Sequence, residues 1–136
     1  MVECLEPSYY LLYVLHTPRG EAPPGRYQSP EVTLAEVVGF LEKFGPFLSA
    51  DARFDLWAHS PSDNATIVWD RHDQIFGYGP LDRYSSKLVS MGFAPGHPSV
   101  PTPHEHYYRV EFDDFAKEIM TAFDWSFSSL HPEDEQ

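Results

Sequence analysis

The sequence is poor in cysteine and in basic residues. These two features argue against a disulfide-bonded protein and against a nucleic-acid-binding protein. Cys4 is the only cysteine among 136 residues, so no intrachain disulfide can form, which favours the reducing cytoplasm. Only nine Lys and Arg residues stand against 21 Asp and Glu, which gives a formal charge of −12 at pH 7. Because nucleic-acid binders neutralise phosphates with clustered basic residues, we expect no nucleic-acid ligand.

Long apolar runs and targeting signals are missing as well. The longest apolar run covers residues 9–15, far short of the roughly 20 residues that cross a membrane. Glu3 and Glu6 precede this run, where a secretory signal would carry Lys or Arg. The sequence therefore predicts a cytoplasmic protein that does not associate with membranes.

The chain also lacks a motif for nucleophilic or phosphate chemistry. No Gly-x-Ser-x-Gly elbow occurs. Residues 77–80 superficially resemble a phosphate-binding turn, but Pro80 lacks an N–H donor and Asp82 adds negative charge. We therefore expect no catalytic residues and no bound cofactor.

Aromatic side chains are abundant instead, since 21 residues are Phe, Tyr or Trp. The negative charge belongs to the folded body, because −9 remains when Glu133, Asp134 and Glu135 are set aside. A negative electrostatic field around the protein favours basic partners and speeds encounter with them.

The first third of the chain predicts a strand, a loop and a helix. Residues 9–15 are rich in aromatic and branched side chains, which is typical of a central strand. Residues 16–30 contain six Pro and Gly residues and indicate a long loop. Thr33 and Glu36 have the spacing of a capping box, and the helix that follows is predicted to end at Gly45 and Pro46.

The rest of the chain predicts strands and two shorter helices. One helix covers residues 80–92, and another begins at Asp113 or Asp114. The buried stripe of the first is predicted to be Leu81, Tyr84, Leu88 and Met91. The predicted strands cover residues 54–59, 65–70, 74–79 and 104–112.

This order, β-α-β-β-β-α-β-α, predicts an α+β fold. Residues 1–125 are expected to form one domain, with a mainly antiparallel five-stranded sheet and helices packed on one face. Too few crossover helices are present for a parallel sheet. Residues 126–136 are predicted to be an acidic, flexible tail.

Two histidines form the strongest candidate for a metal site. His104 and His106 project from the same side of the predicted strand, about 6–7 Å apart. That spacing can present two imidazoles to one ion, and zinc would need at least one further protein ligand. His59, His72 or Glu111 could supply it, so zinc or another transition metal is the alternative cofactor. The alternative is that the two histidines bind no metal and are simply exposed or hydrogen-bonded residues near a strand end.

The fragment His104-x-His106-x4-Glu111 resembles the first metal motif of the cupin family over eight residues. The resemblance would imply a β-barrel with a metal held by these residues. Glu118 stands where a downstream glycine is expected, and only 25 residues follow Glu111, too few for the remaining barrel strands. The chain is therefore not a cupin, and only the histidine pair is kept as a candidate.

A tight turn gathers several ionisable groups. Asp70 and His72 within it are a candidate acid–base pair. Asp70 can instead bond the backbone of its own turn while Arg71 neutralises it, and we favour this structural interpretation.

The sheet face without helices is the candidate binding surface. If Leu11, Leu56 and Ile67 point at the helices, the opposite face carries Tyr10, Trp57, His59 and His104. Aromatic side chains are enriched at binding hot spots. The alternative is that the C-terminal helix or a dimer partner covers this face.

These observations predict a small acidic binding protein, of inhibitor or immunity type, that acts through the open sheet face and the loop of residues 16–30. Its partner is predicted to be a basic protein or a second copy. Its candidate binding residues are Trp57, His59, Asp70, His72, His104 and His106. One alternative is a metal-dependent enzyme or metal-binding protein that uses His104 and His106. Another is a small-molecule pocket under the loop of residues 16–30.

Overall fold

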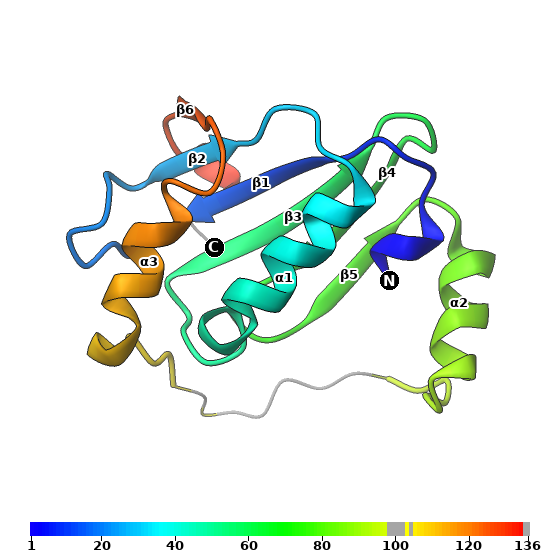
Figure 1. Ribbon diagram of the computed structural model, residues 1–136. Helices are drawn as coiled ribbons and strands as arrows, with labels where there is room; N and C mark the ends of the chain where they lie inside the picture. The colour runs from blue at the N-terminus through cyan, green and yellow to red at the C-terminus, as the bar shows by residue number, and fades with distance from the viewer. Residues whose placement is uncertain (98–102, 104, 135–136) are drawn as a thin grey trace.

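The computed structural model describes residues 1–97, 103 and 105–134, and these build one antiparallel sheet of six strands. The strand order across the sheet is β5-β4-β3-β1-β2-β6 (Figure 1). The strands are β1 (Tyr10–Leu15), β2 (Gly25–Gln28), β3 (Phe54–Ser60), β4 (Ala65–Trp69), β5 (Ile75–Tyr78) and β6 (Ser126–Ser128). The α+β class and the antiparallel sheet are thus confirmed, with six strands rather than the five expected.

One helix lies across the middle of the sheet, and the others flank it. Helix α1 covers one face, α2 stands beyond the β5 side and α3 lies near β2 (Figure 1). The helices are α1 (Leu34–Leu48), α2 (Leu81–Ser90) and α3 (Asp113–Ile119), with short 3₁₀ turns η1 (Val2–Cys4), η2 (Val110–Phe112) and η3 (Pro132–Asp134). Within the described ranges, none of the helices has the length and apolar character needed to cross a membrane.

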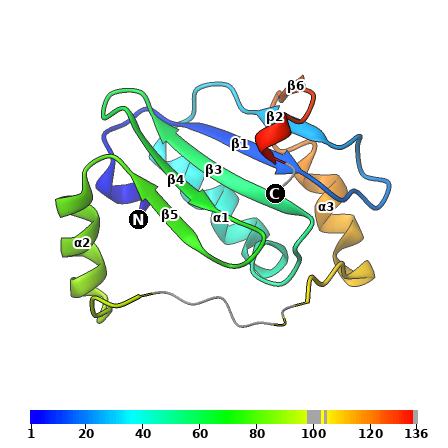
Figure 2. The ribbon, with the colours of Figure 1, turned by 180° about the vertical axis from the view of Figure 1, so that it is seen from behind.

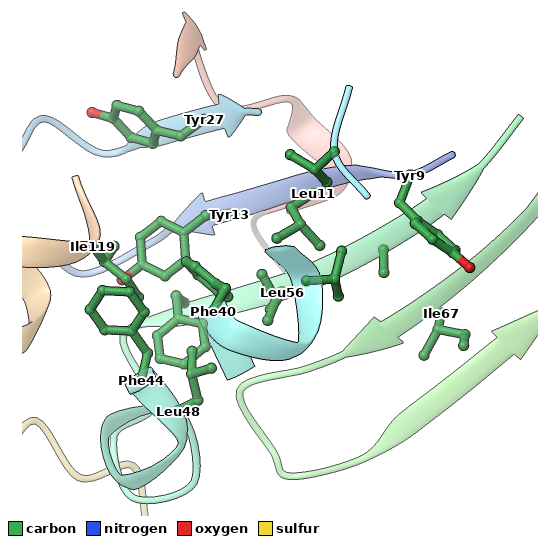
Figure 3. Packing of buried hydrophobic residues seen from close by; sticks show 14 of the residues in the cluster. Tyr9, Leu11, Tyr13, Tyr27, Phe40, Phe44, Leu48, Leu56, Ile67 and Ile119 are labelled. Carbon is green, nitrogen blue, oxygen red and sulfur yellow. The ribbon is translucent and has the colours of Figure 1, made fainter. Parts of the chain in front are cut away.

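The core lies between α1 and the sheet face that it covers. Leu11, Leu56 and Ile67 point into it, as the alternation of side chains predicts. Aromatic residues fill the space between them, and Figure 3 shows Phe40 and Phe44 of α1 meeting Tyr13 of β1. Burying a large apolar side chain contributes about 1.5–3 kcal/mol, so this layer holds the helix on the sheet.

Helix α1 begins as predicted and ends later. Thr33 and Glu36 form the capping box: the backbone N–H of Thr33 donates to Glu36 Oε2 at 2.7 Å, and the N–H of Glu36 donates to Thr33 Oγ1 at 3.3 Å. The prediction that Pro46 ends the helix is wrong, because α1 continues to Leu48. Phe47 and Leu48 are fully buried, and that burial offsets the backbone hydrogen bond that proline cannot make.

Helix α2 has the predicted ends but not the predicted buried stripe. Gly92 has a φ of 92°, and the N–H of Phe93 donates to the carbonyl of Leu88 at 3.0 Å, which is a Schellman exit. Only Tyr84 is buried in this helix. Leu81 and Met91 are 62% and 56% exposed, and Leu88 is half-buried.

Sequence patterns missed two short strands, β2 and β6. Strand β2 lies inside the predicted loop of residues 16–30, where Tyr27 pairs with Tyr13 of β1. Strand β6 lies inside the predicted tail and pairs with β2, with Phe127 opposite Tyr27. With four and three residues, these strands are too short to show an alternating pattern. They form because β1 and then β2 offer free backbone groups along their edges.

The predicted strand over residues 104–112 is wrong over its described part. Residues 105–109 have no regular structure, and Val110–Phe112 form η2. The backbone here is bonded outside the sheet: the carbonyl of Tyr107 accepts from Ala52 N at 2.9 Å, and Arg109 N donates to Asp51 Oδ2 at 2.8 Å. A segment whose backbone groups are already paired in this way does not need a strand partner.

A buried arginine joins these separate segments. Arg53, which directly precedes β3, is 0% exposed. Its Nε and Nη2 each donate to the carboxylate of Asp51 at 2.8 Å. Nη1 donates to Glu21 at 3.2 Å, while Nη2 also reaches Asp113 and the carbonyl of Arg109, both at 3.1 Å. One side chain therefore ties the 16–30 loop, the α1–β3 connection and the start of α3 together.

The electrostatic balance of this cluster favours its charged form. Burial alone would lower the pKa of Arg53, but the hydrogen bonds and charges of Asp51 and Glu21 raise it above its ordinary value. The nearby Tyr13 hydroxyl is buried, and this burial, reinforced by the charge of Glu21, raises its pKa well above the usual range. The cluster therefore contains a charged guanidinium, its carboxylates and a neutral phenol.

Removing the charge of Arg53 should strongly destabilise the fold. Arg53→Met leaves the carboxylates of Asp51 and Glu21 buried without their cation, which costs about 3–5 kcal/mol. Urea unfolding followed by tryptophan fluorescence measures the change. The matched control is Lys43→Met, which breaks a half-exposed ion pair with Glu118 and should cost less than about 1 kcal/mol. Equal losses of unfolding free energy in the two variants would show that the Arg53 cluster stabilises the fold no more than an exposed ion pair does.

Candidate functional site

On the face of the sheet opposite α1, called here the open face, no helix formed by the described residues lies over β1, β3, β4 and β5. Figure 2 shows it from behind, with only the short turn η3 in front of one end of the sheet. The strand register places Tyr10 opposite His59 and Leu12 opposite Trp57 on this face. On β4 and β5 it places Thr66 opposite Tyr78 and Val68 opposite Phe76.

Two adjoining depressions hollow the open face. The larger has a volume of about 510 Å³ and combines aromatic side chains with ionisable ones. Its aromatic lining is Trp57, Phe76 and Tyr78, and its ionisable lining is Asp55, Asp70, Arg71, His72, Glu133 and Asp134. The smaller, of about 320 Å³, is lined by Tyr10, Leu12, Gln28, Trp57, His59, Pro61 and Thr66. Trp57 and Thr66 line both depressions, so they lie where the two depressions meet.

The position of Trp57 depends on an ion pair from the C-terminal segment. The guanidinium of Arg26 lies 5.3 Å from the centre of the Trp57 ring. Arg26 Nη1 donates in turn to the two carboxylate oxygens of Asp134 at 2.8 and 3.1 Å. The Trp57 indole N–H is buried and no described residue accepts its hydrogen bond. A group that brings an acceptor to this N–H would satisfy it.

A histidine–aspartate pair closes one end of the larger depression. His16 Nε2 lies 2.8 Å from Asp55 Oδ2, and the backbone N–H of Arg71 donates to Asp55 Oδ1 at 2.8 Å. Burial works to raise the pKa of Asp55, but the hydrogen bond and charge of His16 and the Arg71 contact outweigh it. The pKa of Asp55 therefore lies below its ordinary value, and this carboxylate is ionised at neutral pH.

The turn after β4 brings two of the predicted histidines together. Asp70 Oδ1 accepts from the backbone N–H groups of His72 and Gln74, both at 2.9 Å, and Asp70 Oδ2 lies 3.1 Å from His72 Nδ1. Asp70 thus makes the turn contacts that the structural interpretation predicts. The rings of His72 and His106 are 4.9 Å apart, centre to centre. This contact could not be read from the sequence, because residues 105–109 are not in a strand.

His59 lies apart from this histidine pair. His59 lines the smaller depression, where its Nδ1 lies 3.0 Å from Thr66 Oγ1. His104 lies outside the described residues, so its part of the metal hypothesis stays a prediction. In the part of the chain that the structure describes, no group of three or more His, Cys, Asp or Glu side chains could hold a metal ion.

Sequence reasoning missed three contributors to the open face. His16 was assigned to the loop, although its spacing from Val14 places it on the face of β1 that points away from α1. Arg26 belongs to the unpredicted β2, and Asp134 to the predicted tail. The alternation of β1, continued by one residue, is the only signal that could have identified any of them.

No protein-family model matches this chain, and no curated protein or solved structure shows significant similarity to it. The fold defines an α+β protein with an aromatic, acid-rimmed sheet face, and its function has to be inferred from that surface.

The lowered pKa of Asp55 predicts a specific pH dependence of stability. A carboxylate with a depressed folded-state pKa stabilises the fold above its unfolded value, here 3.8, and this contribution is lost as the pH falls through the folded pKa. Urea unfolding should therefore show wild type more stable than Asp55→Asn at neutral pH, with the gap narrowing below the ordinary value of 3.8. The control is Asp114→Asn, whose carboxylate is 99% exposed. A gap that stays constant with pH would contradict the assigned role of Asp55.

Proposed function

We propose that this chain is a small acidic binding protein, without catalysis of its own, that contacts a basic protein through the open face. An inhibitor or immunity-type protein is the class that this description fits. The observation that carries the proposal is the larger depression, in which aromatic side chains lie within a rim of carboxylates. Aromatic anchors with a charged rim are the usual composition of a binding hot spot.

The aromatic side chains have the exposure that such anchors need. Tyr78 is 59% exposed and Phe76 is 41% exposed, although both stand on a regular strand. Trp57 is half-buried between the two depressions. Rigid strands hold these rings before a partner arrives, which lowers the entropic cost of binding.

The charge on the rim favours a basic partner. Four carboxylates, those of Asp55, Asp70, Glu133 and Asp134, line the larger depression, against two arginines: Arg71 in its lining and Arg26, which pairs with Asp134. With the formal charge of −12 on the whole chain, the rim would attract cations and repel phosphate groups. We therefore propose a basic protein and not a nucleic acid as the ligand. With Cys4 as its only cysteine, we place the encounter in the cytoplasm.

We assign a structural role to the loop of residues 16–30, which the sequence predicts to take part in binding. Glu21 bonds Arg53 at 3.2 Å, and Arg19 Nε donates to Asp113 at 3.0 Å. The second half of the loop is β2. Because these groups stabilise the fold, we assign the binding surface to the open face alone.

A charge reversal at the rim should weaken binding selectively. The immobilised full chain is incubated with native extract, and captured proteins are identified by mass spectrometry. A basic protein should be recovered, and its affinity is then measured by calorimetry. Glu133→Lys, at an exposed rim position, should weaken binding about threefold to tenfold and flatten its salt dependence.

The matched control is Glu42→Lys, at an exposed position on α1 across the sheet. It changes the net charge of the chain by the same amount, so its affinity should stay close to that of wild type. If both variants weaken binding equally, the overall negative charge of the chain attracts the partner, and no site on the open face is needed. Recovery of no basic protein would refute the proposed function.

A further inference from the structure

A cavity with an apolar lining lies on the α1 side of the sheet, away from the open face. Helix α1 lies over the middle of the sheet and α2 stands beyond β5 (Figure 1), and the cavity between them has a volume of about 690 Å³. Proteins hold small molecules in pockets of about 300–1,000 Å³. One wall is lined by Leu34, Val38 and Leu41 of α1, and the other by Trp69, Ile75 and Met91 from β4, β5 and the end of α2.

The strand register explains why this cavity is apolar. Trp69 of β4 lies opposite Leu56 of β3 on one side and opposite Ile75 of β5 on the other. Residues directly opposite each other share one face of a sheet, and Leu56 belongs to the core under α1. Ile75, at the end of this row, is 57% exposed, and Met91 above it is 56% exposed. The cavity is therefore an extension of the hydrophobic core that opens to the surface.

The charge on the lining favours a neutral ligand. Among the described residues that line the cavity, the ionisable ones are Lys87 and Glu3, and they pair with each other: Lys87 Nζ donates to Glu3 Oε2 at 3.1 Å, which joins α2 to η1. Because this pair is neutral as a whole, the lining has no excess charge for an ionic head group. The formal charge of −12 on the chain also disfavours an anion.

The hydrogen bonds and the length of the cavity narrow the ligand further. The indole N–H of Trp69 already donates to Asp73 Oδ1 at 3.2 Å. A polar group brought deep into this lining would lose its water without compensation. Leu34 and Gly45 both line the cavity and are eleven positions apart in α1, which is about 16 Å along a helix axis. This shape suits an elongated molecule of low polarity.

We propose that this cavity binds a neutral long-chain aliphatic molecule, of the class of fatty alcohols and their esters. Its hydrocarbon chain lies along α1 and removes apolar surface of Ile75 and Met91 from water, which drives the binding. Its one polar group lies beside the Lys87–Glu3 pair, whose side chains are 37% and 60% exposed and therefore in contact with water.

Two probes with the same chain test the ligand class. Decan-1-ol and decanoate are titrated into the wild-type protein at high salt, where the field of the chain is screened, and binding is measured by calorimetry. Decan-1-ol should bind one to one, and at least about tenfold more tightly than decanoate, because the carboxylate would be desolvated without a free cation to pair with. In nitrogen–proton correlation spectra, decan-1-ol should shift the indole signal of Trp69 and leave the signal of Trp57, on the open face, in place.

Variants of neighbouring residues test the location. Val38→Phe fills the cavity and should weaken decan-1-ol binding at least about tenfold. Its control is Gly39→Phe, at an exposed position of α1 where an added Cβ has no heavy atom within 4 Å. A second pair lies at the surface, where it leaves folding intact: Met91→Glu puts a charge at the cavity and should weaken binding, whereas Val89→Glu, 61% exposed and outside the lining, should not.

Urea unfolding of each variant confirms that it is folded before its affinity is compared. No binding of decan-1-ol to the wild type, binding of decanoate as tight as that of the alcohol, or equal affinities within both variant pairs would each overturn the proposal. The cavity and the open face lie on opposite sides of the sheet, and these measurements use no protein partner. A failure here therefore leaves the proposed function untouched, and the reverse also holds.

Discussion

The arrangement of the molecule depends on one buried cation. Arg53 has no exposed surface and bonds groups from three distant parts of the chain: Glu21 in the loop, Asp51 after α1, and Asp113 at the start of α3. A guanidinium so far from water requires carboxylates on several sides, and those carboxylates require it. The segment before α3 is thereby fixed at the end of the sheet, where His106 meets the ring of His72. The buried cluster therefore fixes the position of the segment that borders this end of the open face.

The ratio of helix to sheet decides which surfaces remain free. One helix of 15 residues, α1, covers the middle of one face of a six-stranded sheet. Among the described residues, the opposite face is left to η3 and to the Arg26–Asp134 pair at one end, and β5 has a strand neighbour on one side only. The proposed binding surface follows from this arrangement, because the acidic open face that α1 leaves free suits a basic partner.

The sequence predicted the elements that have strong local patterns. Strand β1 was identified by its run of aromatic and branched residues, strands β3, β4 and β5 by the turn residues between them, and α1 by its capping box. The missed elements depend on distant partners: β2 and β6 exist only because a neighbouring edge is free, and residues 105–109 bond to Asp51 and Ala52 instead of a sheet. For the site, the face shared by Trp57 and His59 follows from the two-residue period. The approach of His72 to His106 has no local signal, and Arg53 was overlooked because a lone arginine has no sequence pattern.

The binding role of the open face is tested most directly at Trp57. Its indole N–H has no acceptor among the described residues, whereas the Trp125 indole donates to the carbonyl of Ile119 at 2.8 Å. The two indole signals can be followed by nitrogen–proton correlation spectroscopy while the captured basic partner is titrated into labelled protein. If the open face is the binding surface, the Trp57 signal shifts in proportion to complex formed and the Trp125 signal stays in place. A saturated complex in which the Trp57 signal is unchanged would contradict the assignment of this face.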